Sequence, residues 1–161
     1  KNLSDPDNDG IHIEINEALP IVDLSTTEKD KKVFGIISDR EDDNDTEHKY
    51  ATGNFVSVFP KKDGDTRLII NSVGEGAIYV VSEMNGETAL KPIDNGDYIT
   101  SSSLAGLGQL QDDDLLHNYT VAKATCDCDF NLSNTKYKCE EFTQNGKTYR
   151  KAFIGCTYHC G

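Results

Sequence analysis

Short apolar runs separated by polar turns recur along the chain, and this pattern predicts strands in preference to helices. Val33 to Ser38 is one such run and is typical of a short buried strand. Ile11, Ile13 and Ile15 alternate with polar residues, which is the period of a half-buried strand. The longest run, residues 77–81, is far below the roughly 20 apolar residues that a membrane span requires.

Asn-Gly and Asp-Gly pairs punctuate these runs and predict hairpin turns. Both pairs readily adopt the positive φ that a type I′ turn demands. Three of them separate two strand-like segments: Asp63-Gly64 between 55–60 and 67–70, Asn85-Gly86 between 77–84 and 87–90, and Asn145-Gly146 between 139–143 and 148–154. A fourth pair, Asn95-Gly96, precedes the strand-like segment 97–100.

The turn at Asn145-Gly146 specifies the register of its hairpin. With this pair as a two-residue loop, opposite charges and two aromatic rings face one another. The predicted partners are Glu141 with Arg150, Glu140 with Lys151, and Phe142 with Tyr149. Each such cross-strand pair stabilises a hairpin by about 0.2–1 kcal/mol.

Two segments are expected to form short helices. Ser25 to Lys32 has Ser25 or Thr26 as a candidate N-cap, and Asp112 to His117 has acidic residues in its first turn. The predicted fold is therefore mainly β: a hairpin-rich sandwich or barrel-like domain with one or two short helices and a Cys-bearing C-terminal hairpin.

Length and charge narrow the class of protein. A chain of 161 residues suits one domain with a small appendage, and the cysteine distribution divides it into 1–125 and a Cys-bearing C-terminal subdomain at 126–161. The formal net charge of -12 argues against a nucleic-acid partner, which requires a basic surface. No segment suggests a membrane partner.

Five cysteines offer three alternatives. They are Cys126, Cys128, Cys139, Cys156 and Cys160. Two disulfides could staple the subdomain and leave one thiol free, and this is the favoured reading. Alternatively, Cys128, Cys139, Cys156 and Cys160 could bind zinc, with His159 as a further ligand, although the C-x2-C spacing of zinc ribbons is missing. The third alternative is unlinked, buried thiols.

Other candidate sites are weaker. Asp5, Asp7 and Asp9 match the first half of a calcium loop, but Asn16 stands where a bidentate Glu belongs, so an acidic turn is favoured. Asp39 to Glu47 holds six acidic residues and is expected to be a solvated loop. No catalytic motif is found and no catalytic residue is assigned. Four glycosylation sequons, at Asn2, Asn44, Asn118 and Asn131, favour an exported or surface-displayed protein.

The order of several segments resembles a known family. The segments are 33–38, 74–81, 95–102, 106–108 and 119–124. This order is similar to the C-terminal domain of phage and viral tail-spike and fibre proteins, the self-cleaving intramolecular chaperone known as peptidase G2. The resemblance covers roughly residues 10–130, and the Cys-bearing tail lies outside it.

The resemblance implies a function in assembly. In that family the domain lies at the end of a trimeric fibre, helps three chains to register, and is released by autoproteolysis at an acidic, Tyr-containing segment. No such segment occurs here, so no cleavage residue is carried over, and cleavage would require a longer precursor. Residues 1–125 would then be a β assembly domain of a homotrimer within a virion, in contact with other virion proteins.

Two expectations complete this reading. The trimer interface should use apolar strand faces that include Ile78, Val80 and Tyr98. The alternative function, from a different class, is a secreted or surface-displayed β-domain that is stapled by disulfides and binds a protein or a glycan.

Overall fold

The structure, a computed structural model, describes residues 22–52, 54–61, 66–84 and 90–160, and within these ranges it contains ten strands and no helix. The prediction of a mainly β fold is confirmed. The strands are β1 (Ile36–Arg40), β2 (Glu47–Thr52), β3 (Phe55–Pro60), β4 (Leu68–Asn71), β5 (Val73–Glu83), β6 (Tyr98–Ser101), β7 (Gly108–Leu110), β8 (Thr120–Ala124), β9 (Lys138–Gln144) and β10 (Lys147–His159).

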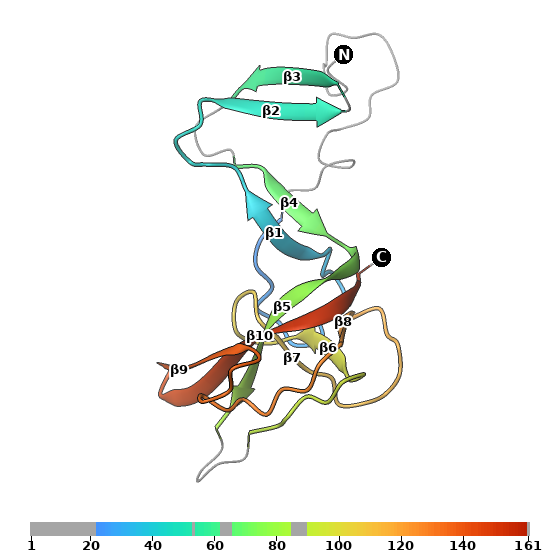
Figure 1. Cartoon of the computed structure of the whole chain (residues 1–161), viewed down its shortest axis with the longest axis vertical. Helices are drawn as coiled ribbons and strands as arrows, with labels where there is room; N and C mark the ends of the chain where they lie inside the picture. The colour runs from blue at the N-terminus through green and yellow to red at the C-terminus, as the bar shows by residue number, and fades with distance from the viewer. Residues whose placement is uncertain (1–21, 53, 62–65, 85–89, 161) are drawn as a thin grey trace.

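Five of these strands close into a small barrel in the lower half of the molecule (Figure 1). Their order is β5-β7-β6-β8-β10, and β10 pairs with β5 to complete the circle. The β5–β7 pair is parallel and the other pairs are antiparallel. Closure leaves these five strands without a continuous open edge, and β9 adds a sixth strand beside β10.

β10 is the strand on which the barrel depends. It pairs with β5 from Tyr149↔Glu83 to His159↔Val73, while its first half also pairs with β9 and its second half with β8. The sheet therefore crosses the predicted boundary between residues 125 and 126. The cysteine-bearing segment supplies a central strand of the barrel.

The core lies inside the barrel and beneath the loops that cover it. Alternate residues of β10 point inward, and Ile154, on this inner side, is 1 % exposed. Two loop residues, Ile93 and Phe130, are equally inaccessible. Gly108 in β7 must lack a side chain, because a Cβ there would lie 2.7 Å from a methyl carbon of Ile99.

Two antiparallel ribbons extend away from the barrel, β1 with β4 and then β2 with β3 (Figure 1). The chain leaves along β1, reverses in the β2–β3 hairpin and returns along β4. A hairpin joining segments 55–60 and 67–70 was therefore wrong, because β3 and β4 each pair with another strand. The buried strand expected at residues 33–38 is β1, which has only β4 beside it and is largely exposed.

The C-terminal hairpin has the predicted register. Asn145 and Gly146 have φ values of 52° and 77°, as a type I′ turn requires. The three predicted cross-strand pairs are confirmed: Glu141–Arg150 at 2.9 Å, Glu140–Lys151 at 3.2 Å, and the stacked rings of Phe142 and Tyr149 at 5.6 Å between centroids. Cys139 lies in β9 and Cys156 in β10.

Both predicted helices were wrong, because side chains satisfy the backbone in other ways. At residues 112–117 the chain bends, and the Leu115 amide donates to the Asp113 carboxylate at 2.9 Å. Residues 25–32 form turns, with Lys29 in the left-handed region at φ 51°. In the part of the chain that the structure describes, no helix is long and apolar enough to cross a membrane.

Several predictions fall outside the described residues. They are the strand at Ile11–Ile15, the acidic turn at Asp5–Asp9, the sequon at Asn2, and the turns at Asp63-Gly64 and Asn85-Gly86. At Asn95-Gly96 a turn precedes β6 as expected, with the Asp97 amide donating to the Asp94 carbonyl at 3.0 Å. Gly96 carries the positive φ there, 105°, whereas Asn95 does not, so this turn differs from type I′.

Candidate functional site

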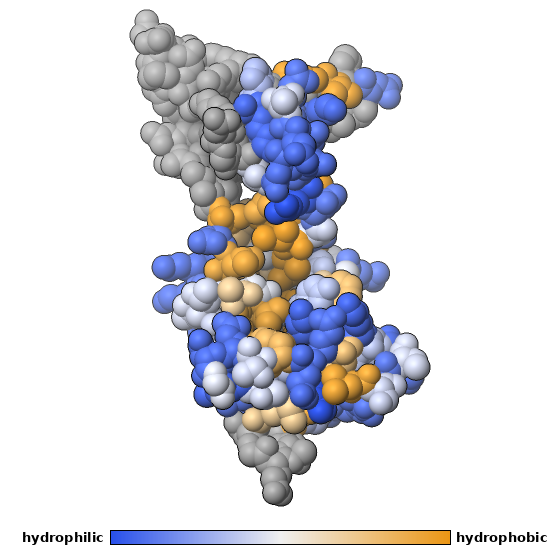
Figure 2. Space-filling model, turned by 90° about the vertical axis from the view of Figure 1, so that its left-hand side faces the viewer, coloured by the Kyte–Doolittle hydropathy of each residue, from blue (hydrophilic) through white to orange (hydrophobic). Residues whose placement is uncertain are grey.

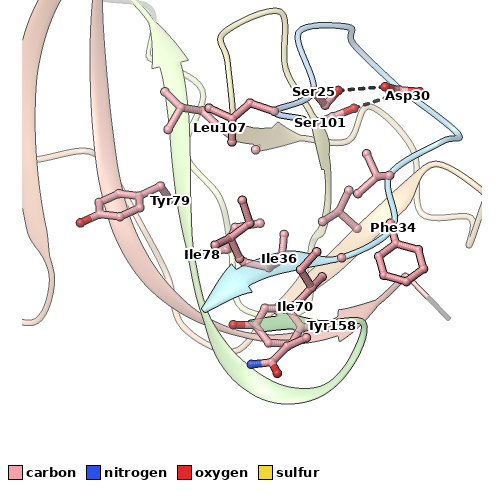
Figure 3. Close-up of a pocket in the computed structure, with 18 of the residues that line it drawn as sticks. Ser25, Asp30, Phe34, Ile36, Ile70, Ile78, Tyr79, Ser101, Leu107 and Tyr158 are labelled. Carbon is pink, nitrogen blue, oxygen red and sulfur yellow. Dashed lines mark hydrogen bonds between the residues drawn. The ribbon is translucent and has the colours of Figure 1, made fainter. Parts of the chain in front are cut away.

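A groove of about 940 Å³ opens between the barrel, the β1–β4 ribbon and the segment that precedes β1 (Figure 3). Its lining includes Ile78 and Tyr158 of the barrel together with Ile36 and Ile70 of the ribbon, and Figure 3 shows Ile36 beside Ile78 and Ile70 beside Tyr158. Phe34, which precedes the ribbon, lies at its edge. The groove is thus formed by segments far apart in the sequence.

Hydrogen bonds hold the segment before β1 against β6. The Asp30 amide donates to Ser101 Oγ at 2.8 Å, and Ser101 Oγ donates to the Thr27 carbonyl at 2.9 Å. Ser25 Oγ donates to the Asp30 carboxylate at 3.0 Å. The Lys32 amide and the Ser25 hydroxyl, in that order, lower the pKa of Asp30. The carboxylate therefore acts as a structural acceptor at one end of the groove.

Glycines let aromatic and aliphatic side chains approach the backbone closely. The ring of Tyr158 lies against Gly76, where any Cβ would overlap it. The Tyr158 hydroxyl donates to the Ala77 carbonyl at 2.8 Å and accepts from the Ala77 amide at 2.9 Å. Burial raises the pKa of Tyr158. This side of the groove is fixed, since both polar functions of the phenol are occupied.

Large apolar side chains at the rim remain half exposed. Leu24 and Phe34 are each 50 % exposed. Tyr79 and Phe153 are 46 % and 44 % exposed, and their ring centroids lie 4.6 Å apart with the rings tilted by 40°. Figure 2 shows hydrophobic residues gathered at the waist of the molecule, with mostly polar surface above and below. The waist therefore presents apolar surface that the described part of the chain does not cover.

The groove is poor in charge. Among the described residues that line it, the charged ones are Asp23, Asp30 and Lys32. The chain as a whole carries a net charge of -12, so this surface differs in character from the rest. Such a lining is suited to apolar packing against a partner.

The cysteines are free thiols in this structure. No two of them are linked here, and the choice between disulfides, a metal site and free thiols stays a prediction. Among the described residues no three His, Cys, Asp or Glu side chains come together as a metal site, and this holds for the candidate set Cys128, Cys139, Cys156 and Cys160. His159 instead lies 3.4 Å from the Thr157 hydroxyl.

Burial makes several of these thiols poor nucleophiles. It raises the pKa of Cys128, Cys139 and Cys160, and it raises that of Cys156 to about 12, with smaller contributions from Cys126 and Cys160. Thiols of this kind remain protonated near neutral pH. Their role in the structure is to fill space in and around the core.

The acidic run has an internal anchor that the sequence did not indicate. Asp42, Asp43 and Asp45 are exposed, as predicted for a solvated loop. Glu41, by contrast, is half-buried and bonds to His48 Nδ1 at 2.7 Å and to the Arg67 amide at 3.1 Å. This contact ties β2, which contains His48, to the residue before β4.

The interface residues expected from the sequence lie elsewhere. Ile78 and Val80 are 4 % and 0 % exposed, so neither offers much surface to a partner, although Ile78 lines the groove. Tyr79, between them on β5, faces outward. The sequence of β5 shows that alternate residues lie on opposite faces of the strand. Which of the two faces lies inside the barrel depends on how the barrel closes.

The sequons at Asn44, Asn118 and Asn131 lie on exposed residues, and the sequon at Asn2 lies outside the described ranges.

In comparisons with known proteins, no family model, no curated protein and no solved structure matches this chain.

Proposed function

We propose that this chain is a structural assembly domain that forms a homotrimer at the C-terminal end of a viral fibre or capsid-appendage protein. The family resemblance suggests the setting: the virion, with other virion proteins as neighbours. The observation that carries the proposal is the apolar lining of the groove, where Leu24, Phe34, Tyr79 and Phe153 are 44–50 % exposed. Monomeric proteins rarely leave large contiguous apolar patches in water.

The projecting ribbons support the same function. A two-stranded ribbon is at best marginally stable in water and needs packing against another element. On the β2–β3 ribbon, Val56 and Val58 are 65 % and 47 % exposed. Association of chains would cover these exposed side chains.

The alternative, a disulfide-stapled β-domain that binds a protein or a glycan, has less support. It relies on linked cysteines, and no cysteine pair is linked in this structure. Cys128 and Cys156 are packed within the core.

Solution mass tests the proposal. Light scattering at physiological salt should give three times 17.8 kDa for the chain over a range of protein concentrations. A mass of 17.8 kDa at every concentration would contradict homotrimer formation by this domain.

The isolated chain should not cleave itself, because the acidic, Tyr-containing segment of the resembled family is missing from its sequence. Purified protein incubated for several days and analysed by intact mass should remain a single species. Acid-hydrolysed protein serves as a positive control for detecting fragments. A discrete new fragment that grows with time would place cleavage chemistry inside this chain.

A further inference from the structure

The groove changes character along its length. One part of its lining is apolar, and Figure 3 shows Ile70 beside Tyr158 there. Away from this part, Figure 3 shows Ser25, Asp30 and Ser101 together, where the Ser25 hydroxyl donates to the Asp30 carboxylate. The groove therefore has an apolar part and a polar end.

A second, more open hollow adjoins the polar end. It shares Thr27, Asp30 and Lys32 with the groove, so the two are continuous. The other residues that line it are Lys29, Lys31, Asn118 and Tyr119. Three of its seven lining residues are thus lysines, in a chain that has 28 acidic and only 16 basic residues. A locally cationic hollow lies at the end of an otherwise apolar groove.

Two of these three lysines are available to a ligand. Lys29 is paired with Asp112 at 2.6 Å, but within the described ranges neither Lys31 nor Lys32 forms an ion pair. Asp30 is the one acidic residue among the seven that line the hollow, and both of its carboxylate oxygens already accept hydrogen bonds. One accepts from the Lys32 amide at 2.9 Å and the other from a serine hydroxyl at 3.0 Å. The hollow therefore offers two exposed ammonium groups to an anion.

The floor of the groove is apolar and lies against the barrel. Ile78, Val121 and Tyr158 line the groove and are only 3–6 % exposed, so they form its deepest part. Leu24 and Phe34, each 50 % exposed, form the rim. The volume of about 940 Å³ falls within the roughly 300–1,000 Å³ that is typical of small-molecule sites. A hydrocarbon chain on this floor would be withdrawn from water.

We propose that the groove and the lysine-lined hollow together bind an amphiphile with one alkyl chain and an anionic head group, of which a long-chain carboxylate is the simplest. The chain lies on the floor of the groove, and the head group lies at Lys31 and Lys32. Burial of the alkyl chain supplies the affinity, and the lysines select the charge of the head group. This site goes beyond the proposed assembly and does not depend on it.

The sign of the head group gives a sharp test, because the whole chain and the hollow favour opposite charges. A net charge of -12 attracts cations in general, whereas the hollow favours an anion. Calorimetric titrations at physiological salt compare decanoate with decyltrimethylammonium, which has an alkyl chain of the same length. Decanoate should bind one to one, with a dissociation constant smaller by about tenfold. Equal or tighter binding of the cation, or no binding of decanoate, would overturn the proposal.

The length of the alkyl chain tests the groove. Decanoate should bind about four- to fifteenfold more tightly than octanoate, as one or both of the additional methylene groups become buried. Equal affinities would mean that the chain stays in water, and the proposed site would then be wrong.

Charge-removing variants test the hollow. Lys31→Gln combined with Lys32→Gln should weaken decanoate binding by about three- to tenfold and leave the binding of uncharged decanol unchanged. Lys136→Gln is the matched control, since Lys136 is exposed and lies outside the lining of both hollows. Undiminished decanoate binding by the double variant would contradict the assignment of the head group to these lysines.

A fluorescence reporter locates the alkyl chain without relying on a charge change. The chain contains no Trp, so Phe34→Trp places a single indole at the rim of the groove. Its emission should move to shorter wavelength as decanoate is added, whereas Leu132→Trp, at a residue of similar exposure outside the groove lining, should show no shift. An unchanged Phe34→Trp spectrum at saturating decanoate would overturn the proposal.

Light scattering of the same samples keeps the two proposals distinguishable. A trimer that binds no decanoate would overturn the amphiphile site and leave the proposed function standing. A monomer that binds decanoate with the expected selectivity would reject the homotrimer and support the site.

Discussion

Tyr137 organises the loop that leads from β8 to β9. Its side chain is buried, with 8 % exposed, and its hydroxyl donates to the Asp129 carboxylate. The same oxygen accepts from the amide of Asp129 at 3.1 Å. Burial, followed by the neighbouring carboxylate, raises the pKa of Tyr137. One phenol therefore satisfies a charged side chain and a backbone donor in a loop that covers the core.

Tyr137→Phe should lower the free energy of unfolding by about 0.5–1.5 kcal/mol, because it removes the hydrogen bonds of the Tyr137 hydroxyl, while Asp129 is exposed and still accepts from the Asn131 amide. Urea denaturation at neutral pH measures the change. Tyr149→Phe is the matched control, since its ring stacks on Phe142. That variant should differ from wild type by less than about 0.5 kcal/mol. Equal losses in the two variants would contradict the role assigned to Tyr137.

The same contact predicts a pH dependence. The hydrogen bond from Tyr137 is the main cause that lowers the pKa of Asp129 below its ordinary 3.8. A lowered folded-state pKa means that the contribution of Asp129 is complete above about pH 3.8 and is lost as the pH falls through the folded-state value. Unfolding free energies measured between pH 6 and pH 2 should fall less steeply for Tyr137→Phe than for wild type. If the unfolding free energies of both proteins fell equally with pH, the Tyr137–Asp129 pair would not be the cause of the pH dependence.

Thiol reactivity follows from burial. Cys156 has a pKa raised to about 12 and is 2 % exposed. In the folded protein at pH 8, iodoacetamide should modify it at least about a hundred times more slowly than a free cysteine, because the thiolate is the nucleophile. Peptide mapping after timed labelling gives the rate, and protein unfolded in urea provides the reference. Rapid labelling of Cys156 in the folded state would refute its assignment as a core residue.

At the scale of elements, the sequence predicted those contacts that are local. The β9–β10 register follows from a two-residue turn and its neighbouring pairs, and the structure reproduces it. The β1–β4 ribbon was missed because its strands are separated by the whole β2–β3 hairpin. The helix expected at 25–32 failed for a similar reason: Asp30 and Thr27 bond to Ser101, far along the chain. The groove depends on these distant contacts, so its residues could not be identified beforehand.

The turn of the β9–β10 hairpin can be tested at its glycine. Gly146 has φ of 77°, and Gly146→Ala should cost about 1–2 kcal/mol, since a Cβ disfavours this region. Asn145→Gly is the control, because Asn145 already adopts φ of 52°. Glycine at position 145 relieves the strain of a positive φ, but it also gives the unfolded chain more conformational freedom. These effects oppose one another, so the free energy of unfolding should change by less than about 1 kcal/mol. Thermal unfolding of both variants gives the comparison; a larger loss for Asn145→Gly would contradict the turn assignment.

At the scale of the whole molecule, the acidic surface opposes association of chains, whereas the apolar waist favours it. Three copies of a chain with net charge -12 repel one another, and salt screens this repulsion over about 8–10 Å at physiological ionic strength. The trimer should therefore loosen at low ionic strength and tighten as salt rises, which a light-scattering series measures. Replacing exposed acids of the acidic loop, Asp43→Asn with Asp45→Asn, should flatten the dependence. A trimer insensitive to salt would reject this electrostatic account and keep the assembly.

The closing of the barrel by β10 has a consequence for biosynthesis. β5 is translated long before β10. The edge of β5 that includes Glu83 pairs with β10, where Tyr149 is the partner of Glu83, so this edge has to wait for the later strand. A nascent chain that has emerged as far as β8 holds an open sheet with an unpaired edge on β5. The groove cannot be complete either, because Phe153 and Tyr158 belong to β10. A contact of the proposed trimer that uses the groove could therefore form only after translation has passed β10.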